Sequence, residues 1–295
     1  MSTLNPYKVV ITGAQGQVGR ELQATAPSKW HLVACGSREL DVTQPPAVRQ
    51  FLERERPALV IHAAAYTDVD GAEGQADKAE AVNAAGAANV ADGTSRIGAR
   101  LIHISTDFVF DGRQGYPYSP DDEPSPLGVY GRTKVAGERE VTRITGGAAL
   151  VVRTAWVYSQ YGHNFVHTML ELMSRRESVG VVCDQVGTPT WGRPLGAALW
   201  RAAECPELRG ILHWTDAGVA SWYDFAVAIQ EEALGLGLLP RAVPVRPLRS
   251  EEFPAVARRP LYSVLDKTTG WAAMGGPARH WRENLRLMLK GLAGG

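Results

Sequence analysis

The sequence has few cysteines, no surplus of charge of either sign and no long hydrophobic run. Its three cysteines, Cys35, Cys183 and Cys205, are widely spaced and odd in number, which excludes a disulfide framework and fits a reducing, cytoplasmic setting. The 31 basic and 31 acidic residues cancel, so we expect no nucleic acid or other polyanion as a partner. No apolar run approaches the roughly 18 residues of a membrane span, so no membrane partner is expected either.

Two further absences limit the kinds of site. The seven histidines are scattered without the spacing of metal ligands, so no metal site is expected. The segment from Met1 to Lys8 has no apolar core or cleavage pattern, and we expect no signal peptide. With 295 residues, 45% hydrophobic and 21% charged, the chain is long enough for one α/β domain with a substantial core and a smaller appended lobe.

Short apolar segments alternate with longer segments rich in Ala, Glu, Gln and Arg through the first half of the chain. Strands are expected at 8–12, 31–35, 59–65, 100–105 and 149–158, and helices at 18–26, 46–56, 76–98 and 130–143. This alternation predicts an α/β fold, a Rossmann-like doubly wound parallel sheet with helices on both faces. We assign it to a first domain over residues 1–158.

The pattern changes after Tyr158. Strand-like pieces at 179–184 and 210–215 are separated by Gly- and Pro-rich loops, and a Pro-rich stretch at 240–260 follows a helical segment at 223–234. We expect residues 159–295 to form mainly a smaller C-terminal lobe that binds the substrate. A later strand near 181–215 is expected to return to the sheet, so that the two parts interleave.

A glycine-rich turn follows the first strand, with the sequence Gly13-Ala14-Gln15-Gly16-Gln17-Val18-Gly19. The first glycine suits a tight turn, the second lets a pyrophosphate approach the backbone, and the third lets helix and strand pack closely. The N-terminus of the helix that follows offers free N–H groups to phosphate. Its place between a strand and a helix favours a dinucleotide site over a turn without a ligand.

Tyr130 and Lys134 are four residues apart on a predicted helix and therefore share a face. An ammonium group beside a phenol favours the phenolate, so we expect Lys134 to lower the pKa of Tyr130 toward neutral pH. Such a tyrosine can donate a proton to a carbonyl oxygen while a hydride reaches the carbon.

Ser105, Thr106 and Asp107 follow the predicted strand at 100–105. Ligands of a doubly wound sheet lie at the carboxyl ends of its strands, so these side chains are expected to face the site and to bind the substrate carbonyl, unless they only cap the strand. We interpret His103 as a residue of the sheet.

These motifs resemble those of the extended short-chain dehydrogenases. The resemblance rests on Gly13–Gly19, Ala63-Ala64-Ala65-Tyr66, Ser105-Thr106-Asp107-Phe108-Val109-Phe110 and Tyr130-Gly131-Arg132-Thr133-Lys134. Later motifs resemble the dTDP-4-dehydrorhamnose reductases: Thr154-Ala155-Trp156-Val157-Tyr158, Asn164-Phe165, Thr168-Met169-Leu170 and Asp184-Gln185-Val186-Gly187-Thr188-Pro189-Thr190. The similarity covers residues 8 to about 268.

The resemblance implies NAD(P)H-dependent reduction of the 4-keto group of a small-molecule nucleotide sugar, dTDP-4-dehydro-L-rhamnose. It gives Tyr130 the role of proton donor, makes Lys134 a ligand of the cofactor ribose and completes the catalytic group with Thr106. It places Ala63–Ala65 along the cofactor and Trp156 against the deoxysugar, where an indole suits an apolar sugar face; a tryptophan of the core is the alternative.

Three more positions carry over from the same resemblance. Asn83 corresponds to an asparagine that supports a helix bend or a water near the lysine, or that only packs. Arg258 and Arg259 precede the segment 263–266, and one of them is expected to meet the substrate diphosphate.

The end of the second strand bears on the choice of cofactor. It reads Gly36-Ser37-Arg38 and lacks the acidic residue that binds an NAD ribose. Ser37 and Arg38 suit a 2′-phosphate, so we expect NADPH to be preferred over NADH, unless Arg38 is only solvated. Asp41, with Val42, corresponds to the family's position near the adenine, whereas Glu39 is expected to point elsewhere along a short strand at 39–41.

Alternatives remain at this stage. One is an epimerase or dehydratase of the same fold, with Asp107 as an acid, and another is a non-catalytic nucleotide-binding subunit resembling the regulator of methionine adenosyltransferase. Some relatives form dimers around a divalent ion whose acidic ligands have no match here, so both a monomer and a homodimer stay open, as does the metal.

Overall fold

The computed structural model describes residues 5–294; residues 1–4, part of the N-terminal segment considered above for a signal peptide, and residue 295 lie outside this range. The strands are β1 (Asn5–Thr12), β2 (His31–Cys35), β3 (Pro57–His62), β4 (Arg100–Thr106), β5 (Leu150–Thr154), β6 (Val157–Tyr158), β7 (Val179–Val182), β8 (Val186–Gly187), β9 (Thr190–Trp191), β10 (Gly210–His213), β11 (Ala220–Ser221) and β12 (Val245–Leu248).

The helices differ widely in length. They are α1 (Gln17–Ala24), α2 (Pro45–Glu55), α3 (Val69–Gly74), α4 (Ala76–Glu80), α5 (Gly86–Ile97), α6 (Val129–Ile144), α7 (Phe165–Arg175), α8 (Gly192–Glu204), α9 (Trp222–Gly235), α10 (Thr268–Ala273) and α11 (Trp281–Ala293). Three short turns complete them: a π-helical turn (Ala81–Ala85) and two 3-10 turns (Asp107–Val109 and Ser250–Glu252). No helix among residues 5–294 is long and apolar enough to cross a membrane.

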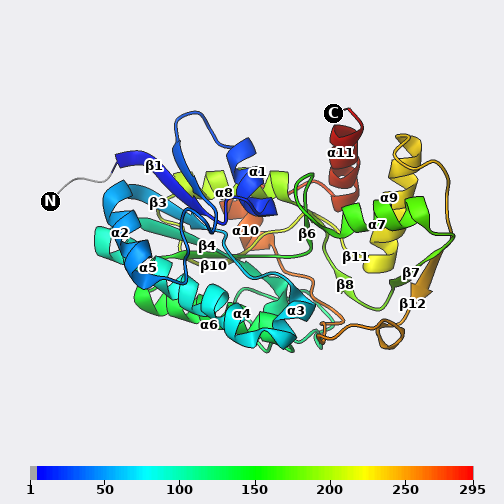
Figure 1. Cartoon of the computed structure of the whole chain (residues 1–295), viewed down its shortest axis with the longest axis horizontal. Coiled ribbons are helices and arrows are strands. Elements are labelled where there is room, and N and C mark those ends of the chain that lie inside the picture. Colours follow the sequence, from blue (N-terminus) through cyan, green and yellow to red (C-terminus); the bar gives the residue numbers. More distant parts are fainter. Residues whose placement is uncertain (1–4, 295) are drawn as a thin grey trace.

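The central sheet has six parallel strands in the order β10-β5-β4-β3-β1-β2. Helices α1, α8 and α10 cover one face of the sheet, packing Leu22, Leu199 and Trp200 against it. Helices α2, α5 and α6 cover the other face (Figure 1). The predicted doubly wound α/β fold is confirmed.

The order of the strands places a crevice at one edge of the sheet. From β1 the chain pairs β2 on one side and then crosses to β3 on the other, so the loops after β1 and β3 leave the sheet in opposite directions. Ligands of open parallel sheets bind outside the carboxyl ends of the strands at such a reversal. The fold therefore predisposes this edge to hold a ligand.

The second half of the chain builds a separate lobe and also returns to the sheet. Helices α7, α9 and α11 pack with β7 and β12 around a core that contains Met173, Phe225 and Leu285. Of the two strand-like pieces predicted in this half, β7 pairs with β12 outside the central sheet, whereas β10 pairs with β5 inside it. Helix α8 also covers the sheet, so the two halves interleave (Figure 1).

Two predicted elements are interrupted. The strand expected at 149–158 ends at Thr154, because Trp156 has a left-handed backbone with φ of 46°, and the chain then pairs with β9 through β6. The helix expected at 76–98 is divided by the π-helical turn that contains Asn83. Both irregularities lie next to the crevice.

Helix α6, which carries the predicted tyrosine and lysine, is tied to the sheet by a buried ion pair. Arg153 of β5 donates to both carboxylate oxygens of Glu138, over 3.0 and 2.7 Å. Their side chains are 1% and 4% exposed. A bidentate pair of this kind fixes orientation as well as distance, so it sets the position of α6 on the sheet.

Candidate active site

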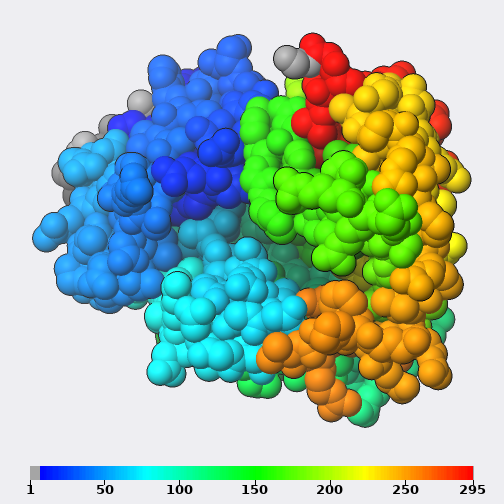
Figure 2. Space-filling model, turned by 45° about the vertical axis from the view of Figure 1, so that its right-hand side comes forward, coloured from blue at the N-terminus to red at the C-terminus, as the bar shows by residue number. Residues whose placement is uncertain are grey.

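A cavity of about 1060 Å³ lies where the carboxyl edge of the sheet faces the second lobe. Figure 2 shows it as a hollow between the blue and cyan segments of the first half and the green and orange segments of the second. Its lining comes from the loops after β1, β3 and β4, from α6, and from residues of the second lobe. Because ligand pockets usually measure about 300–1,000 Å³, this one has room for a cofactor and a substrate together.

The glycine-rich turn forms one wall of the cavity. Gly13 has φ of 67°, and a Cβ there would lie 2.5 Å from Ala64 N, so only glycine fits between the loops after β1 and β3. Gly19 does not line the cavity; it packs against the turn, where a Cβ would lie 2.3 Å from Gly13 O. The other predicted residues of this turn, Gln15, Gly16, Gln17 and Val18, line the cavity at the start of α1.

The end of β2 supplies a second group of lining residues. Ser37, Asp41 and Val42 line the cavity, whereas Arg38 is exposed and does not line it. No strand forms at 39–41: residues 37–39 make a turn in which Glu39 Oε2 accepts from Gly36 N over 2.8 Å. The expectation of a strand is wrong here. Glu39 does not line the cavity, as expected, because its carboxylate is bound to the backbone of the turn.

The loop after β3 is fixed from two sides. Ala63, Ala64 and Ala65 line the cavity, and Thr12 Oγ1 lies 2.6 Å from His62 Nδ1 just below them. On the other side, Asn83 Oδ1 accepts from Tyr66 N over 2.8 Å. Its Nδ2 donates to Tyr66 O over 3.1 Å and to Thr133 Oγ1 over 3.0 Å. Asn83 thus joins this loop to α6, beside the predicted catalytic residues.

The three predicted catalytic residues meet at one wall of the cavity. Tyr130 and Lys134 lie one turn apart on α6, and both line the cavity. Thr106 ends β4 and lines the same wall of the cavity. Phe108 N donates to Thr106 Oγ1 over 3.2 Å, which holds the hydroxyl at the end of the strand.

Burial, rather than the lysine, controls the acidity of Tyr130. The expectation that Lys134 lowers the pKa of Tyr130 is wrong, because burial raises that pKa to about 12. Lys134 Nζ instead donates to Ile104 O over 2.8 Å, and burial lowers its pKa to about 8. At neutral pH, Tyr130 therefore keeps its proton for donation and Lys134 is mostly charged.

Three more ionisable groups are buried near these residues. Ser105 and Asp107 line the cavity on either side of Thr106, and burial raises the pKa of Asp107 to about 6. His62 and His103 stack with ring centroids 5.2 Å apart in the sheet below. Burial lowers the pKa of both, that of His62 to about 3, so both imidazoles are neutral.

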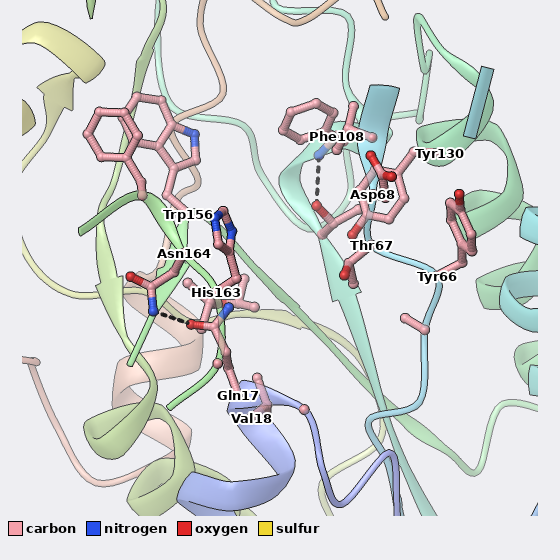
Figure 3. Close-up of a pocket in the computed structure, with 18 of the residues that line it drawn as sticks. Gln17, Val18, Tyr66, Thr67, Asp68, Phe108, Tyr130, Trp156, His163 and Asn164 are labelled. Atoms are coloured by element: carbon pink, nitrogen blue, oxygen red, sulfur yellow. Dashed lines mark hydrogen bonds between the residues drawn. The ribbon is translucent and has the colours of Figure 1, made fainter. Parts of the chain in front are cut away.

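Aromatic residues of the second half form the opposite wall. Trp156 lines the cavity and stacks on Trp222, with ring centroids 3.5 Å apart and an interplanar angle of 3°. Figure 3 shows Trp156 and His163 facing Tyr130 and Phe108 across the cavity. A ligand that reaches Tyr130 therefore has an apolar platform opposite the phenol.

A hydrogen bond joins the glycine-rich turn to the second lobe. Asn164 Nδ2 donates to Gln17 Oε1 over 3.1 Å and to Ser159 O over 2.7 Å (Figure 3). Asn164 Oδ1 also accepts from Val166 N at the start of α7. The same side chain thus caps a helix of the lobe and positions Gln17 at the cavity.

The two predicted arginines have different positions. Arg259 lines the cavity and forms an ion pair with Asp70, with Nη2 donating to Oδ2 over 2.7 Å. Its Nε is buried and has no hydrogen-bond partner among residues 5–294. Arg258 is exposed and does not line the cavity, so only Arg259 is brought to the site.

Several lining residues have no separate signal in the sequence. Trp222, His163, Phe253 and Asp70 reach the cavity from segments remote from the glycine-rich turn. Trp222 directly follows Ser221, which caps α9 together with Asp224, and this pattern predicts a helix start but no ligand contact. Within the described residues, no group of three or more His, Cys, Asp or Glu side chains is arranged to hold a metal ion.

The parallel sheet, the glycine-rich turn and the Thr106–Tyr130–Lys134 group define a class of protein: a Rossmann-fold oxidoreductase of the short-chain dehydrogenase type. Within this class the chain belongs to the RmlD substrate binding domain family, whose model matches residues 7–293. The predicted family is thereby confirmed.

Similar proteins cover nearly the whole chain. A Mycolicibacterium smegmatis protein named dTDP-4-dehydrorhamnose reductase is 44% identical over 95% of this chain and 84% of its own length. A Streptomyces antibioticus protein named probable dTDP-4,6-dihydroxy-2-methyloxan-3-one 4-ketoreductase is 42% identical over 94% of this chain and 92% of its own. A dTDP-4-dehydrorhamnose reductase of Bacillus anthracis, solved in complex with NADP, is 36% identical with a TM-score of 0.91, covering 97% of this chain and all of that one.

Proposed function

We propose that this chain reduces the 4-keto group of dTDP-4-dehydro-L-rhamnose to give dTDP-L-rhamnose, with NADPH as the preferred hydride donor and NADH as the alternative. Two kinds of similarity support the substrate and the cofactor: the 44% identical relative has this reductase name, and the structural relative binds NADP. The geometry of the cavity supports the reaction independently.

The observation that carries the proposal is the convergence of Thr106, Tyr130 and Lys134 on one wall of the cavity. A carbonyl oxygen within reach of Tyr130 and Thr106 accepts two hydrogen bonds and then the proton of Tyr130. When bound, a reduced nicotinamide supplies the hydride to the carbonyl carbon. The ammonium of Lys134, held by its hydrogen bond to Ile104 O, offers a donor to the cofactor ribose.

The glycine-rich turn fits the diphosphate of such a cofactor. A Cβ on Gly16 would contact only Gly13 O, at 3.3 Å, so the space above this glycine is open. Helix α1 begins directly after Gly16, and the free N–H groups of a helix N-terminus favour an anion. Ser37, Asp41 and Val42 would hold the adenosine half, and Arg38 lies within the same turn as Ser37, on the solvent side.

The opposite wall fits a 6-deoxysugar nucleotide. The stacked Trp156 and Trp222 offer an apolar face to the ring and its methyl group. The unpartnered Nε of Arg259 offers a donor to the diphosphate, and its guanidinium is already oriented by Asp70. We propose that residues 159–295 contribute most of these substrate contacts, as the domain assignment predicts.

The experiment is a reduced-nicotinamide oxidation assay with dTDP-4-dehydro-L-rhamnose and the purified full chain. We expect stoichiometric loss of NADPH and formation of dTDP-L-rhamnose, whereas an epimerase that recycles its cofactor gives no net loss. Turnover of the same keto-sugar linked to UDP shows whether the enzyme selects the thymine base. Turnover of the dTDP-sugar in the name of the Streptomyces relative shows whether it selects the sugar. No turnover with any of them would refute the proposal.

We also propose that the protein acts in the cytoplasm, where its three free cysteines would stay reduced. Cys35 is buried in the sheet, whereas Cys183 and Cys205 are partly exposed. A monomer and a homodimer are distinguished by light scattering with and without a chelator, which also tests for a divalent ion between subunits.

A further inference from the structure

A short segment of the second half of the chain meets the first half at the rim of the cavity. This segment, the strap, comprises residues 253–259 and follows the 3-10 turn Ser250–Glu252. Its two end residues, Phe253 and Arg259, line the cavity. Figure 2 shows the orange segment that contains the strap beside the cyan segment that contains α3. The strap therefore forms part of the border between the two halves.

The chain is firmly fixed on both sides of the strap. Before it, Ser250 N donates to both carboxylate oxygens of Asp184 over 3.0 Å, and Ser250 Oγ donates to Asp184 Oδ1 over 2.6 Å. After it, Val186 N donates to Leu261 O over 2.7 Å. Both attachments are to the second half of the chain, so they do not by themselves hold the strap against the first half.

Asp70 of α3 supplies the attachment to the first half. Its Oδ1 accepts from Ala257 N over 2.9 Å, and its Oδ2 accepts from Arg259 Nη2 over 2.7 Å. Within residues 5–294, these are the hydrogen bonds that join 254–259 to the rest of the chain. The middle of the strap has little other packing, since Val256 is 73% exposed. One carboxylate thus holds both the backbone of the strap and its cavity-lining arginine.

Resting on the proposed function, we propose that Asp70 is a positioning residue for the diphosphate of the nucleotide sugar. It acts through Arg259, whose guanidinium it holds at the cavity in the orientation that binds the diphosphate. Asp70 itself needs no contact with the ligand.

The donors of Arg259 suit this arrangement. A guanidinium has five N–H groups in a rigid fork. The bond to Asp70 is the one hydrogen bond of this guanidinium among residues 5–294, so its other N–H groups are left for a ligand. A free arginine loses conformational freedom when it binds a ligand, whereas an arginine already held by a carboxylate has lost much of it beforehand. Asp70 therefore lowers the entropic cost of binding the diphosphate.

The negative charge of Asp70 has the opposite effect, because it repels the diphosphate. The side chains of Arg259 and Asp70 are 24% and 37% exposed, so water and salt screen this repulsion. The orientation of the guanidinium is not screened. We therefore expect removal of Asp70 to weaken binding of the diphosphate, and the sign of the change decides between the two effects.

The test measures binding of dTDP to the full chain by calorimetry, in the presence of saturating NADP. Asp70→Ala should raise the Kd about two- to tenfold, the cost of ordering one long side chain. Asp70→Asn keeps one acceptor oxygen and should give a smaller loss. The Kd for NADPH should not change in either variant. With the keto-sugar as substrate, KM should rise by the same factor as the Kd for dTDP, with kcat little changed.

A double-mutant cycle shows whether Asp70 acts through Arg259. Arg259→Ala should weaken binding of dTDP about 10- to 100-fold, the worth of a hydrogen bond to a charged group. Adding Asp70→Ala to it should cause no further loss. Asp77→Ala is the matched control, because Asp77 is an exposed acid of α4 that does not line the cavity. Tighter binding by Asp70→Ala, or an equal loss with and without Arg259, would overturn the proposal.

Hydrogen exchange on the ligand-free protein tests the attachment without any substrate. Asp70→Ala should speed exchange in a peptide that contains Ala257, whereas Asp77→Ala should not; unchanged exchange would overturn the role of Asp70. Binding of UDP is measured in parallel, because it has the same diphosphate. If the keto-sugar is not reduced but the cycle holds with dTDP or UDP, only the proposed substrate is refuted. If neither diphosphate binds the wild type, the positioning role is refuted.

Discussion

Replacing Lys134 with methionine should stabilise the protein while it abolishes activity. The Lys134 side chain is 2% exposed, and its ammonium has one hydrogen bond, to Ile104 O. Methionine has a similar length and no charge, so the variant removes a buried cation without leaving a large cavity. The expected gain follows from the pKa of the lysine.

The magnitude can be worked out from that pKa, which falls from 10.5 to about 8 on folding. At about 1.36 kcal/mol for each tenfold change, the buried charge costs about 3 kcal/mol at pH 7. Loss of the bond to Ile104 O offsets about 1–2 kcal/mol of this. We therefore expect Lys134→Met to be more stable than wild type by about 1–2 kcal/mol at pH 7.

The pH dependence gives a sharper test than the gain itself. Because the folded-state pKa of Lys134 is lowered, the penalty is complete below pH 8 and is relieved as pH rises toward 10.5, where the unfolded chain binds more protons than the native one. The advantage of the variant should thus shrink by about 2 kcal/mol between pH 7 and pH 9.5. Urea unfolding followed by tryptophan fluorescence measures it. An advantage that is constant with pH would refute the reasoning.

Three further substitutions test the assigned roles. Tyr130→Phe should lower kcat about 10²- to 10⁴-fold with the Kd for NADPH unchanged; near-normal turnover would place the acid elsewhere. Trp156→Ala should raise KM for the keto-sugar more than for the cofactor, because it removes the platform stacked on Trp222; equal effects would indicate a packing role. Arg38→Ala should reduce the ratio of kcat/KM for NADPH over NADH about two- to fivefold, since an exposed ion pair contributes about 0.2–1 kcal/mol. A wild-type preference for NADH would contradict the role given to Ser37 and Arg38.

The position of the site could be predicted from the sequence because local signals decide it. Each strand that leads into the cavity, β1, β3 and β4, contains a short apolar run, and small or hydroxyl residues end the strand or follow it within two positions. Parallel strands bring such endings to one edge of the sheet, so Gly13 and Thr106 had to lie on the same side. The spacing of Tyr130 and Lys134 needed only the period of a helix.

The pKa of Tyr130 and the aromatic wall of the cavity could not be predicted from the sequence, because tertiary packing decides both. The pKa of Tyr130 depends on how completely the fold covers the phenol, and spacing on a helix carries no information about that. The stack of Trp156 on Trp222 joins residues 66 positions apart (222 − 156) across two elements. The interrupted strand before β6 also depends on this packing, since the left-handed φ of Trp156 turns the indole toward the cavity.

Burial of charge alone does not mark the functional residues of this chain. Arg153 and Glu138 are as deeply buried as Lys134, yet their charges satisfy each other and only position α6. Asp216 is buried with an unpartnered oxygen and a pKa raised to about 7, but it does not line the cavity. Lys134 and Asp107 are buried without an oppositely charged side chain bound to them, and both also line the cavity near Tyr130. A buried ionisable group left short of partners in a cleft that a ligand can reach is the arrangement typical of functional sites.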